Sequence, residues 1–245
     1  MGTGNDLSRS LGWGAGCSHL DAHVIAAAVL RAQPLPLDRW RVTIKPRRSR
    51  LSRLGRLRGE KTLLAYNYVS VGVDAQVALD FHRARAQFLY RYASRWLNYA
   101  AYAVLGAGRF WDAGSCGDLE RRVRATADGR ALELPPLQAL VLLNIRCWGA
   151  GVALWTSEDV PEQSMSDGKL EVVGISSSFH IARLQCGLAE PYRFTQASRV
   201  EIELNGTCAM QVDGEPWMQG PAAISVERAG QSLVLQAPPQ EEDSH

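Results

Sequence analysis

Two carboxylates near the C-terminal end of the sequence are spaced for proton-transfer chemistry. Asp213 and Glu215 flank Gly214 in the stretch QVDGEPW, between two segments that alternate like strands. Two carboxylates at this spacing can converge on one site, where one takes a proton from an attacking hydroxyl and the other orients it or raises its pKa. An Asp-Gly pair is also a strong signal of a tight hairpin. The residues alone leave both alternatives open, a catalytic pair or a plain turn with two solvated carboxylates.

The first residues of the sequence, GTGND, have the composition of a phosphate-binding loop. Gly2 and Gly4 lack Cβ, so their backbone amides can approach an anion closely, and Thr3 adds a hydroxyl. A helix that begins at Asp6 would direct its positive end the same way, and the Asp6 carboxylate could hold Mg²⁺ or a bridging water. The same residues also suit an ordinary turn followed by a helix cap.

A third turn, in the stretch SDGKLEVV, combines a carboxylate with exposed backbone carbonyls. Asp167 precedes Gly168 and a strand-like segment. Oxygen atoms in a tight loop suit a hard cation, although the same dipeptide also forms ordinary turns. The histidines add no metal site, because His19 and His23 share a helix face without a third ligand at a metal spacing.

Residues 45–58, KPRRSRLSRLGRLR, contain seven positive charges and no acidic residue. This composition predicts an exposed loop, which is either a solvated hairpin tip or a surface for acidic membrane lipid. Each Lys or Arg near an acidic leaflet contributes on the order of 1 kcal/mol, so the run would hold a domain at a membrane. No aromatic residue interleaves with the arginines, which argues against nucleic acid as a partner. The lipid interpretation assigns the surface to Lys45, Arg47, Arg48, Arg50, Arg53, Arg56 and Arg58.

The composition is that of an ordinary globular protein. The 245 residues are 46% hydrophobic and carry a net charge of +2, so no global field attracts nucleic acid. Five scattered cysteines, never spaced C-x-x-C, favour a reducing compartment and argue against a disulfide framework or a zinc site. No signal peptide is evident, and the apolar stretch at residues 137–145 is too short to cross a bilayer. We therefore expect a cytoplasmic protein whose contact with membranes is peripheral.

Alternating hydrophobic segments dominate from residue 37 onward and predict an antiparallel β-sandwich or barrel. Turn dipeptides of the Asp-Gly and Asn-Gly type separate several of these segments. Many short strands joined by such turns are typical of these two architectures. The expected strands are LDRWRVTIK, TLLAYNYVSVGV, VRATADGRAL, KLEVVGI, RVEIEL, AMQV, AISVE and LVLQA.

Three helices are expected beside the strands. A short one spans residues 6–11, and a second spans residues 18–32 and ends before two prolines. Between residues 77 and 105, aromatic and aliphatic residues recur at spacings of three and four, which predicts an amphipathic helix packed on the sheet. A lipid-facing role for its aromatic stripe is the alternative. The polar tail at residues 238–245 is expected to be disordered.

Six motifs occur in an order that resembles one protein family. GTGNDLSRSLGWG, LDRW, NYVSVGVDA, LNIRCWGAG, DGKLEVVG and QVDGEPW together look like the C-terminal portion of a eukaryotic diacylglycerol kinase. The resemblance covers nearly the whole chain, and the stretches LEVVGISSSFHIARLQCGLAEPYRFTQA and MQVDGEPWMQGP look most like the epsilon isotype. It implies an ATP-dependent lipid kinase in signalling, which uses Mg²⁺ and converts 1,2-diacylglycerol to phosphatidic acid. The nucleotide would sit between an α/β lobe and a β-sandwich lobe.

The resemblance also implies which residues meet the nucleotide. Backbone and side-chain groups of the first loop would contact it, while two aspartates would join a magnesium and water network around its phosphates. The four loop residues and the two aspartates are Gly2, Thr3, Gly4 and Asn5, and Asp6 and Asp38.

Three further carboxylates have counterparts in the family. Asp213 and Glu215 match the carboxylates taken as the catalytic pair near the lipid hydroxyl. Asp167 falls on the family's structural metal loop. Ser166 stands where the family usually has an aspartate, so this loop lacks one metal ligand.

The fold implied is mainly β with helices (α+β), an antiparallel β-sandwich-like lobe with a helical insertion. Residues 1–36 are expected to be the C-terminal remnant of the α/β catalytic domain. Residues 37–237 are expected to form the accessory domain, with the insertion at about residues 77–105, followed by the disordered tail at residues 238–245.

The family's G-G-D-G-T loop and everything before it are missing from the sequence. We therefore expect an N-terminally truncated chain that is inactive, or nearly so, without the missing N-terminal kinase lobe. The competing hypothesis is a natural short product that binds acidic lipid or diacylglycerol without catalysis and competes with the full enzyme. A sugar-binding sandwich unrelated to kinases would require all six motifs to be coincidental.

Overall fold

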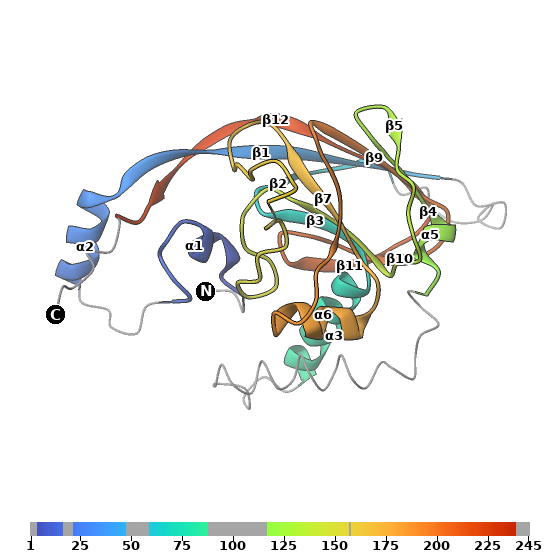
Figure 1. Ribbon diagram of the computed structural model, residues 1–245, viewed down its shortest axis with the longest axis horizontal. Coiled ribbons are helices and arrows are strands. Elements are labelled where there is room, and N and C mark those ends of the chain that lie inside the picture. Colours follow the sequence, from blue (N-terminus) through green and yellow to red (C-terminus); the bar gives the residue numbers. More distant parts are fainter. Residues whose placement is uncertain (1–3, 17–21, 48–58, 88–116, 157, 239–245) are drawn as a thin grey trace.

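Two six-stranded antiparallel sheets form a sandwich in the computed structural model, which describes residues 4–16, 22–47, 59–87, 117–156 and 158–238 (Figure 1). Every strand pairing within the two sheets is antiparallel. The mainly β fold with helices that was expected from the sequence is therefore confirmed.

The first sheet has the order β2-β1-β12-β9-β4-β5 and the second has the order β11-β10-β3-β6-β7-β8. The strands of the first sheet are β2 (Lys61–Ala65), β1 (Gln33–Pro46), β12 (Ala222–Gln236), β9 (Arg199–Leu204), β4 (Val123–Ala127) and β5 (Arg130–Ala131). Those of the second are β11 (Glu215–Gln219), β10 (Cys208–Val212), β3 (Tyr68–Gly72), β6 (Ala139–Leu143), β7 (Leu170–Ile175) and β8 (Tyr192–Ala197). The described helices are α1 (Asp6–Ser10), α2 (Ala22–Arg31), α3 (Val73–Gln87), α5 (Leu119–Arg122) and α6 (Ser178–Gln185).

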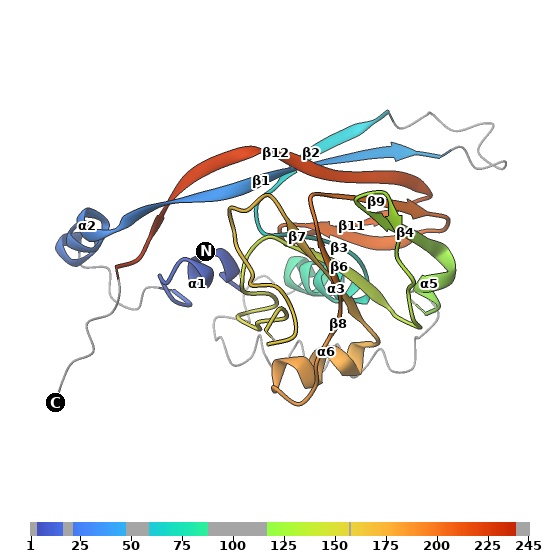
Figure 2. The ribbon, with the colours of Figure 1, turned by 45° about the horizontal axis from the view of Figure 1, so that its top comes forward.

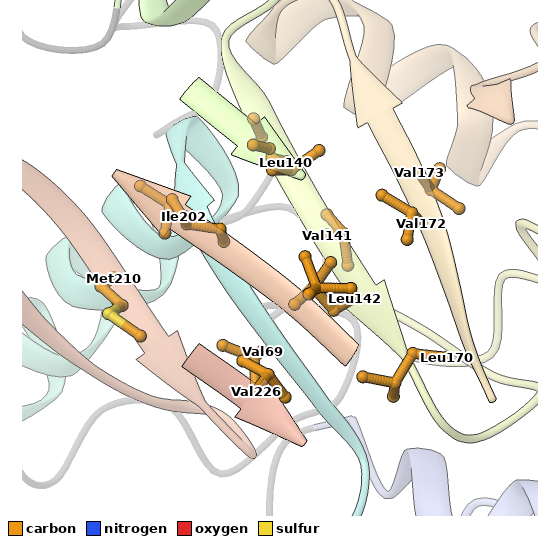
Figure 3. Packing of buried hydrophobic residues seen from close by; sticks show 14 of the residues in the cluster. Val69, Leu140, Val141, Leu142, Leu170, Val172, Val173, Ile202, Met210 and Val226 are labelled. Carbon is orange, nitrogen blue, oxygen red and sulfur yellow. The ribbon is translucent and has the colours of Figure 1, made fainter. Parts of the chain in front are cut away.

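The core lies between the two sheets and follows from strand alternation. In β9, Val200, Ile202 and Leu204 are buried while Arg199 and Glu201 are exposed. β6 and β7 are buried along their whole length, as is typical of central strands covered on both faces. Figure 3 shows side chains from both sheets meeting in this core.

β1 and β12 form a ribbon that is longer than the sandwich. They pair from Gln33 opposite Gln236 to Pro46 opposite Ala222. The part of the ribbon that includes Gln33 extends away from the sandwich and leads to α2, as Figures 1 and 2 show. No helix in the described residues is long and apolar enough to span a bilayer.

A smaller apolar cluster fixes the N-terminal segment to this ribbon. Its buried members are Leu11, Leu37, Ile145 and Met165. The Trp13 indole N–H also donates to the carbonyl of Leu235 in β12 at 2.6 Å. The segment that carries α1 is thereby held beside the sandwich.

The structure corrects several element boundaries. TLLAYNYVSVGV was expected as one strand, but the chain turns at residues 66–67 and passes from β2 in one sheet to β3 in the other. AISVE and LVLQA, expected as two strands, are both parts of β12. β6, β8, β11 and α6 were not expected. α3 begins at Val73 rather than at residue 77, and residues 88–105 of the expected insertion lie outside the described part.

Gly72, at the end of β3, is expected to tolerate no side chain. Its φ is +129°, and a Cβ there would lie 2.0 Å from the carbonyl oxygen of Gln138 and 2.6 Å from Cα of Ala139. Because backbone rather than a flexible side chain must move, Gly72→Ala should lower the free energy of unfolding by more than about 3 kcal/mol. Gly129→Ala is the matched control: its φ is +79° with nothing within 4 Å of the added Cβ, so it should cost about 1 kcal/mol. Equal losses in urea unfolding would contradict the steric argument.

Candidate active site

Three consecutive backbone amides hold the Asp213 carboxylate. The amides of Asn67 and Tyr68 donate to Oδ1 at 2.8 and 3.1 Å, and the amide of Tyr66 donates to Oδ2 at 2.8 Å. Asp213 and Gly214 have left-handed φ values of 51° and 84° between β10 and β11. The predicted hairpin turn is therefore confirmed, and its first residue is tied to the turn between the two sheets.

The two carboxylates of this hairpin have different surroundings. Burial raises the pKa of the Asp213 carboxyl above its ordinary value, and the hydrogen bonds from the three backbone amides oppose that rise. A carboxylate with a raised pKa is better matched to general-base work near neutral pH. Glu215 is exposed, and among the described residues no hydrogen bond joins its carboxylate to Asp213. Their action as a catalytic pair stays a prediction.

Asp6 is buried at the start of α1 and is bound by the loop after β6. Its Oδ1 accepts the amides of Ala150 and Gly151 at 2.8 and 3.0 Å. Residues 149–151 have three consecutive left-handed φ values, 55°, 78° and 110°, and such a concave backbone can direct successive amides at an anion. Gly4 lies beside the same carboxylate, because a Cβ there would be 3.0 Å from Oδ2. Burial raises the pKa of Asp6, and its hydrogen bonds and the Arg9 charge oppose the rise.

Tyr68 connects these two carboxylates. Its backbone amide donates to Asp213, and its hydroxyl donates to Asp6 Oδ2 at 3.4 Å. The GTGND and QVDGEPW motifs, from opposite ends of the sequence, therefore meet around one tyrosine. Asn5 braces the first loop by donating from its side-chain amide to the carbonyl of Ala15 at 2.6 Å. Residues 1–3, which include two expected nucleotide ligands, Gly2 and Thr3, lie outside the described residues.

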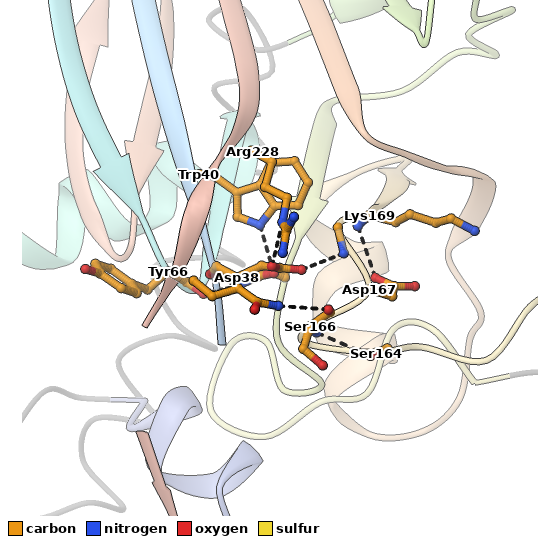
Figure 4. Close-up of polar contacts among 11 residues, drawn as sticks. Asp38, Trp40, Tyr66, Ser164, Ser166, Asp167, Lys169 and Arg228 are labelled. Carbon is orange, nitrogen blue, oxygen red and sulfur yellow. Dashed lines mark hydrogen bonds and ion pairs between the residues drawn. The ribbon is translucent and has the colours of Figure 1, made fainter. Parts of the chain in front are cut away.

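Asp38 is the centre of another group of hydrogen bonds, which is called the Asp38 node and is shown in Figure 4. Its carboxylate is fully buried in β1, where Oδ1 accepts the Arg228 Nε–H of β12 at 2.8 Å and Oδ2 accepts the Gly168 amide at 2.6 Å. The Asp38 amide donates to the carbonyl of Met165 at 2.8 Å. These contacts fasten the loop before β7 to the ribbon.

Asn144 links the Asp38 node to the turn between β2 and β3. Its buried side-chain amide donates to the carbonyls of Asp38 and Tyr66 at 2.8 and 2.6 Å. Its side-chain oxygen accepts the Trp40 indole N–H at 2.8 Å. The expected site residues Asp38 and Asp213 are thus supported by one connected set of hydrogen bonds.

The aspartates expected to bind Mg²⁺ fit the ion unequally. Both oxygens of Asp38 already accept hydrogen bonds in a fully buried setting, which does not fit direct coordination. Asp6 fits better, because its Oδ2 is held by a long hydrogen bond of 3.4 Å from the Tyr68 hydroxyl and can turn to an ion more easily. Asp167 is exposed, and its Oδ1 accepts the Lys169 amide at 3.0 Å. The described residues contain no group of three or more His, Cys, Asp or Glu side chains arranged to hold a metal ion, so metal binding stays a prediction.

Glu171 is a buried carboxyl that the sequence analysis did not single out. It lies in β7, and its oxygens accept the side-chain amides of Gln163 and Gln196 at 2.8 and 3.2 Å. Burial raises the pKa of Glu171 to about 7, the nearby Asp167 charge adds to the rise, and the amide bonds oppose it.

Asp74, in the first turn of α3, is a further buried carboxyl near the site. Its Oδ2 accepts the Ser70 hydroxyl of β3 and the Gln211 side-chain amide of β10, the latter at 2.8 Å. Burial raises the pKa of Asp74. The carboxyl joins α3 to the two strands that carry Tyr68 and precede Asp213.

Two members of the expected lipid surface lie in the described part and make ion pairs. Lys45 lies 3.7 Å from Glu60, and Arg47 lies 2.6 Å from Glu203. The other five expected members lie outside the described residues: Arg48, Arg50, Arg53, Arg56 and Arg58.

Three supporting features were missed by reasoning from the sequence. They are the amide turn at residues 66–68, the left-handed loop at residues 149–151, and Arg228. The Gly-Ala-Gly run in LNIRCWGAG was a usable signal for the loop, since such runs favour positive φ. Arg228 gave no local signal, because its contact with Asp38 follows from the register of β1 and β12.

A family model and the curated relatives agree on one family. A family model described as the diacylglycerol kinase accessory domain matches residues 64–216. Human diacylglycerol kinase theta is 34% identical over 240 residues, which cover 96% of this chain and 25% of the relative. Diacylglycerol kinase 1 of Arabidopsis thaliana is 36% identical over 255 residues, which cover 100% of this chain and 34% of the relative. The chain thus spans about a quarter to a third of the length of these curated relatives.

Solved structures support the fold. A putative diacylglycerol kinase from Bacillus anthracis str. Sterne matches with a TM-score of 0.51 at 15% identity, covering 97% of this chain and 67% of the other. The match at residues 64–216 falls inside the expected accessory domain, while the exact domain boundaries and the isotype stay predictions.

Removing the Asp38 carboxylate should destabilise the fold. Asp38→Ala leaves the Arg228 Nε–H and the Gly168 amide without the buried carboxylate that accepts from them, which should lower the free energy of unfolding by about 2–4 kcal/mol. Glu227→Ala is the control, because its pairs with Arg41 and Arg199 are at the surface and should be worth about 0–1 kcal/mol. Urea unfolding measures both losses. A loss for Asp38→Ala no larger than the control would show that the node is not structural.

Glu171 should make stability fall as pH rises. Its pKa in the folded chain, about 7, exceeds the ordinary value of 4.5, so the folded state binds more protons between these values. The contribution of Glu171 to the free energy of unfolding should therefore be complete below pH 4.5. It should fall by about 3 kcal/mol as the pH rises from 4.5 through 7. Glu171→Gln cannot ionise and should flatten the decline, whereas the exposed Glu201→Gln should leave it unchanged. An identical pH profile for Glu171→Gln and the unsubstituted chain would refute the assignment.

Proposed function

Because the chain belongs to the diacylglycerol kinase accessory domain family, we propose that it supplies the accessory lobe of an ATP-dependent kinase that converts 1,2-diacylglycerol to phosphatidic acid. The observation that carries the proposal is the bridge made by Tyr68 between Asp6 of the GTGND loop and Asp213 of the hairpin. A kinase needs the groups that bind the nucleotide phosphates and the group that accepts the proton to lie close together. This bridge supports such an arrangement.

Asp213 is the proposed general base. It takes the proton of the lipid's primary hydroxyl as that oxygen forms a bond to the γ-phosphorus and the bond from this phosphorus to the β-phosphate oxygen breaks, which releases ADP. The three amide bonds hold the carboxylate in position, and burial keeps its pKa above the ordinary value. Glu215, two residues along, is proposed to orient the hydroxyl.

The first loop is the proposed phosphate side of the site. Gly4 and Asn5, with Gly2 and Thr3 before them, would meet the nucleotide. Mg²⁺ bound with ATP would neutralise phosphate charge, and Asp6 Oδ2 is the described oxygen that best fits it. Asp38 supports the site through Arg228 and Gly168 rather than through the ion, since its carboxylate is fully buried under these contacts.

The proposed partner is the N-terminal kinase lobe that the resemblance to the family implies. α2 has no buried residue, and Val24 and Leu30 are 64% and 86% exposed. Leu233 in the outer part of β12 is 77% exposed. These side chains suit an apolar interface with such a lobe, and the chain alone should therefore show little or no turnover.

The proposed site of action is the cytoplasmic surface of a membrane, where diacylglycerol resides. Residues 45–58 would contact acidic lipid head groups there. The pairs of Lys45 with Glu60 and of Arg47 with Glu203 are exposed and therefore weak, so lipid phosphates can replace the carboxylates.

A chimera tests the catalytic role of the hairpin. This chain replaces the segment that it matches in Arabidopsis diacylglycerol kinase 1, and formation of phosphatidic acid from ATP and vesicle-borne diacylglycerol is measured. Asp213→Asn should lower kcat by about 10²–10³-fold, because the base is lost, and Glu215→Gln should lower it less. In active variants the rate should rise with pH as the Asp213 carboxyl loses its proton.

Asp128→Asn is the matched control for this experiment. Asp128 also begins an Asp-Gly hairpin, has a φ of 48°, and accepts the backbone amides of Ser198 and Arg199. It should leave turnover within about twofold of the unsubstituted chimera. If Asp213→Asn behaves like Asp128→Asn, Asp213 belongs to a structural turn and the proposed role is wrong.

A further inference from the structure

Arg9 is a cation held between the first loop and the loop after β6. It lies in the last turn of α1, and its Nε–H donates to the Gly4 carbonyl at 3.0 Å. Its guanidinium also lies against Gly151, where a Cβ would be 3.2 Å from Nη1 and 3.5 Å from Cζ. The absence of a side chain at Gly151 therefore makes room for the guanidinium at this place.

The terminal nitrogens of Arg9 have no acceptor in the part of the chain that the structure describes. The contact that fixes the side chain uses Nε, and Arg9 is half-buried, so Nη1 and Nη2 can meet a ligand. The nearby Asp6 carboxylate instead accepts from Ala150, Gly151 and Tyr68. A guanidinium whose planar fork is fixed but not fully used is suited to phosphate oxygens.

The negative charge of Asp6 beside the first loop makes a cation favourable there for phosphate binding. Asp6 places a carboxylate beside Gly4, and this charge would repel a phosphate that approached the loop. The Arg9 charge already acts on Asp6 and lowers the pKa of that carboxyl against the effect of burial. Arg9 can offset the repulsion and is already in place before a ligand arrives.

We propose that Nη1 and Nη2 of Arg9 bind a phosphate group of the nucleotide beside the first loop. The proposal rests on the proposed function, since it takes this loop as the phosphate side of a nucleotide site. It adds to that site a cationic side chain, a group which the residues expected from the sequence did not include.

Arg9→Gln separates phosphate binding from the structural hydrogen bond between Arg9 Nε–H and the Gly4 carbonyl, which is called the clamp below. The glutamine side-chain nitrogen follows three carbons, as Nε of arginine does, so it can still donate to the Gly4 carbonyl while Nη1, Nη2 and the charge are removed. Arg9→Met removes the donor as well and reports the cost of losing the clamp. Arg121→Gln, on α5 at the other end of the sandwich, controls for the loss of one positive charge (Figure 1).

In the active chimera, Arg9→Gln should raise KM for ATP by about 10- to 100-fold while the urea midpoint stays unchanged. Arg121→Gln should leave KM for ATP unchanged. If Arg9→Gln keeps the KM of the unsubstituted chimera and Arg9→Met is destabilised, Arg9 is a clamp only and the proposal is overturned.

Calorimetric titration of the 245-residue chain with ADP supplies a readout that does not need turnover. ADP should bind the unsubstituted chain and bind Arg9→Gln about 10-fold or more weakly, with the difference shrinking at high salt. Equal affinity, or no binding by the unsubstituted chain, would overturn the phosphate site. ADP binding that depends on Arg9, together with an inactive chimera, would overturn the proposed kinase function and leave the phosphate site standing.

Discussion

The contact between the Asp213 carboxylate and the amides of residues 66–68 is the constraint on which the site depends. At this point the chain leaves β2 in one sheet and enters β3 in the other, so these amides are not all used in strand pairing. Asp213 gives each of them an acceptor, and they give a half-buried charge its donors. The same three hydrogen bonds therefore fix both the crossing of the chain between the sheets and the position of the carboxylate. It also sets the position of Tyr68, whose hydroxyl reaches Asp6.

Carboxylates bound by backbone amides recur in this molecule and divide the work of support. Asp6 is held by residues 149–151, and Asp38 is held by Gly168 together with Arg228. Phosphoryl transfer depends mostly on positioning and on charges fixed in advance, and amides held by the fold supply both without rearrangement. The difference between the two aspartates lies in their free capacity. The carboxylate of Asp38 is fully buried and acts as a support. Asp6 is also buried, but its Oδ2 makes a long hydrogen bond of 3.4 Å with the Tyr68 hydroxyl and lies beside Gly4 of the first loop.

The sequence was informative where the signal is local. Strand alternation and the Asp-Gly turns predicted an antiparallel sandwich, and Asp213 with Gly214 forms the hairpin that they indicated. It was misleading at Tyr66 and Asn67, because an uninterrupted apolar alternation hides a turn whose amides are satisfied by a residue far along the chain. The partners of Asp38 were equally out of reach, since Arg228 comes opposite β1 only through the register of a long ribbon that contains a bulge near Arg39. Local motifs therefore identified the candidate residues Asp213 and Asp38, whereas the partners of these residues follow from strand pairing between distant parts of the chain.

The ribbon of β1 and β12 has an architectural consequence. Gln33 and Gln236 face each other at its outer end, so the chain enters and leaves the sandwich at adjoining positions. A unit whose entry and exit adjoin can be carried by another domain as an insert, because the host needs to open at a single point. The ribbon then acts as a stalk whose length sets how far the sandwich stands from its host. Its bulge lies beside the fully buried Asp38, so the contacts of Asp38 with Gly168 and Arg228 brace the stalk where it joins the sandwich.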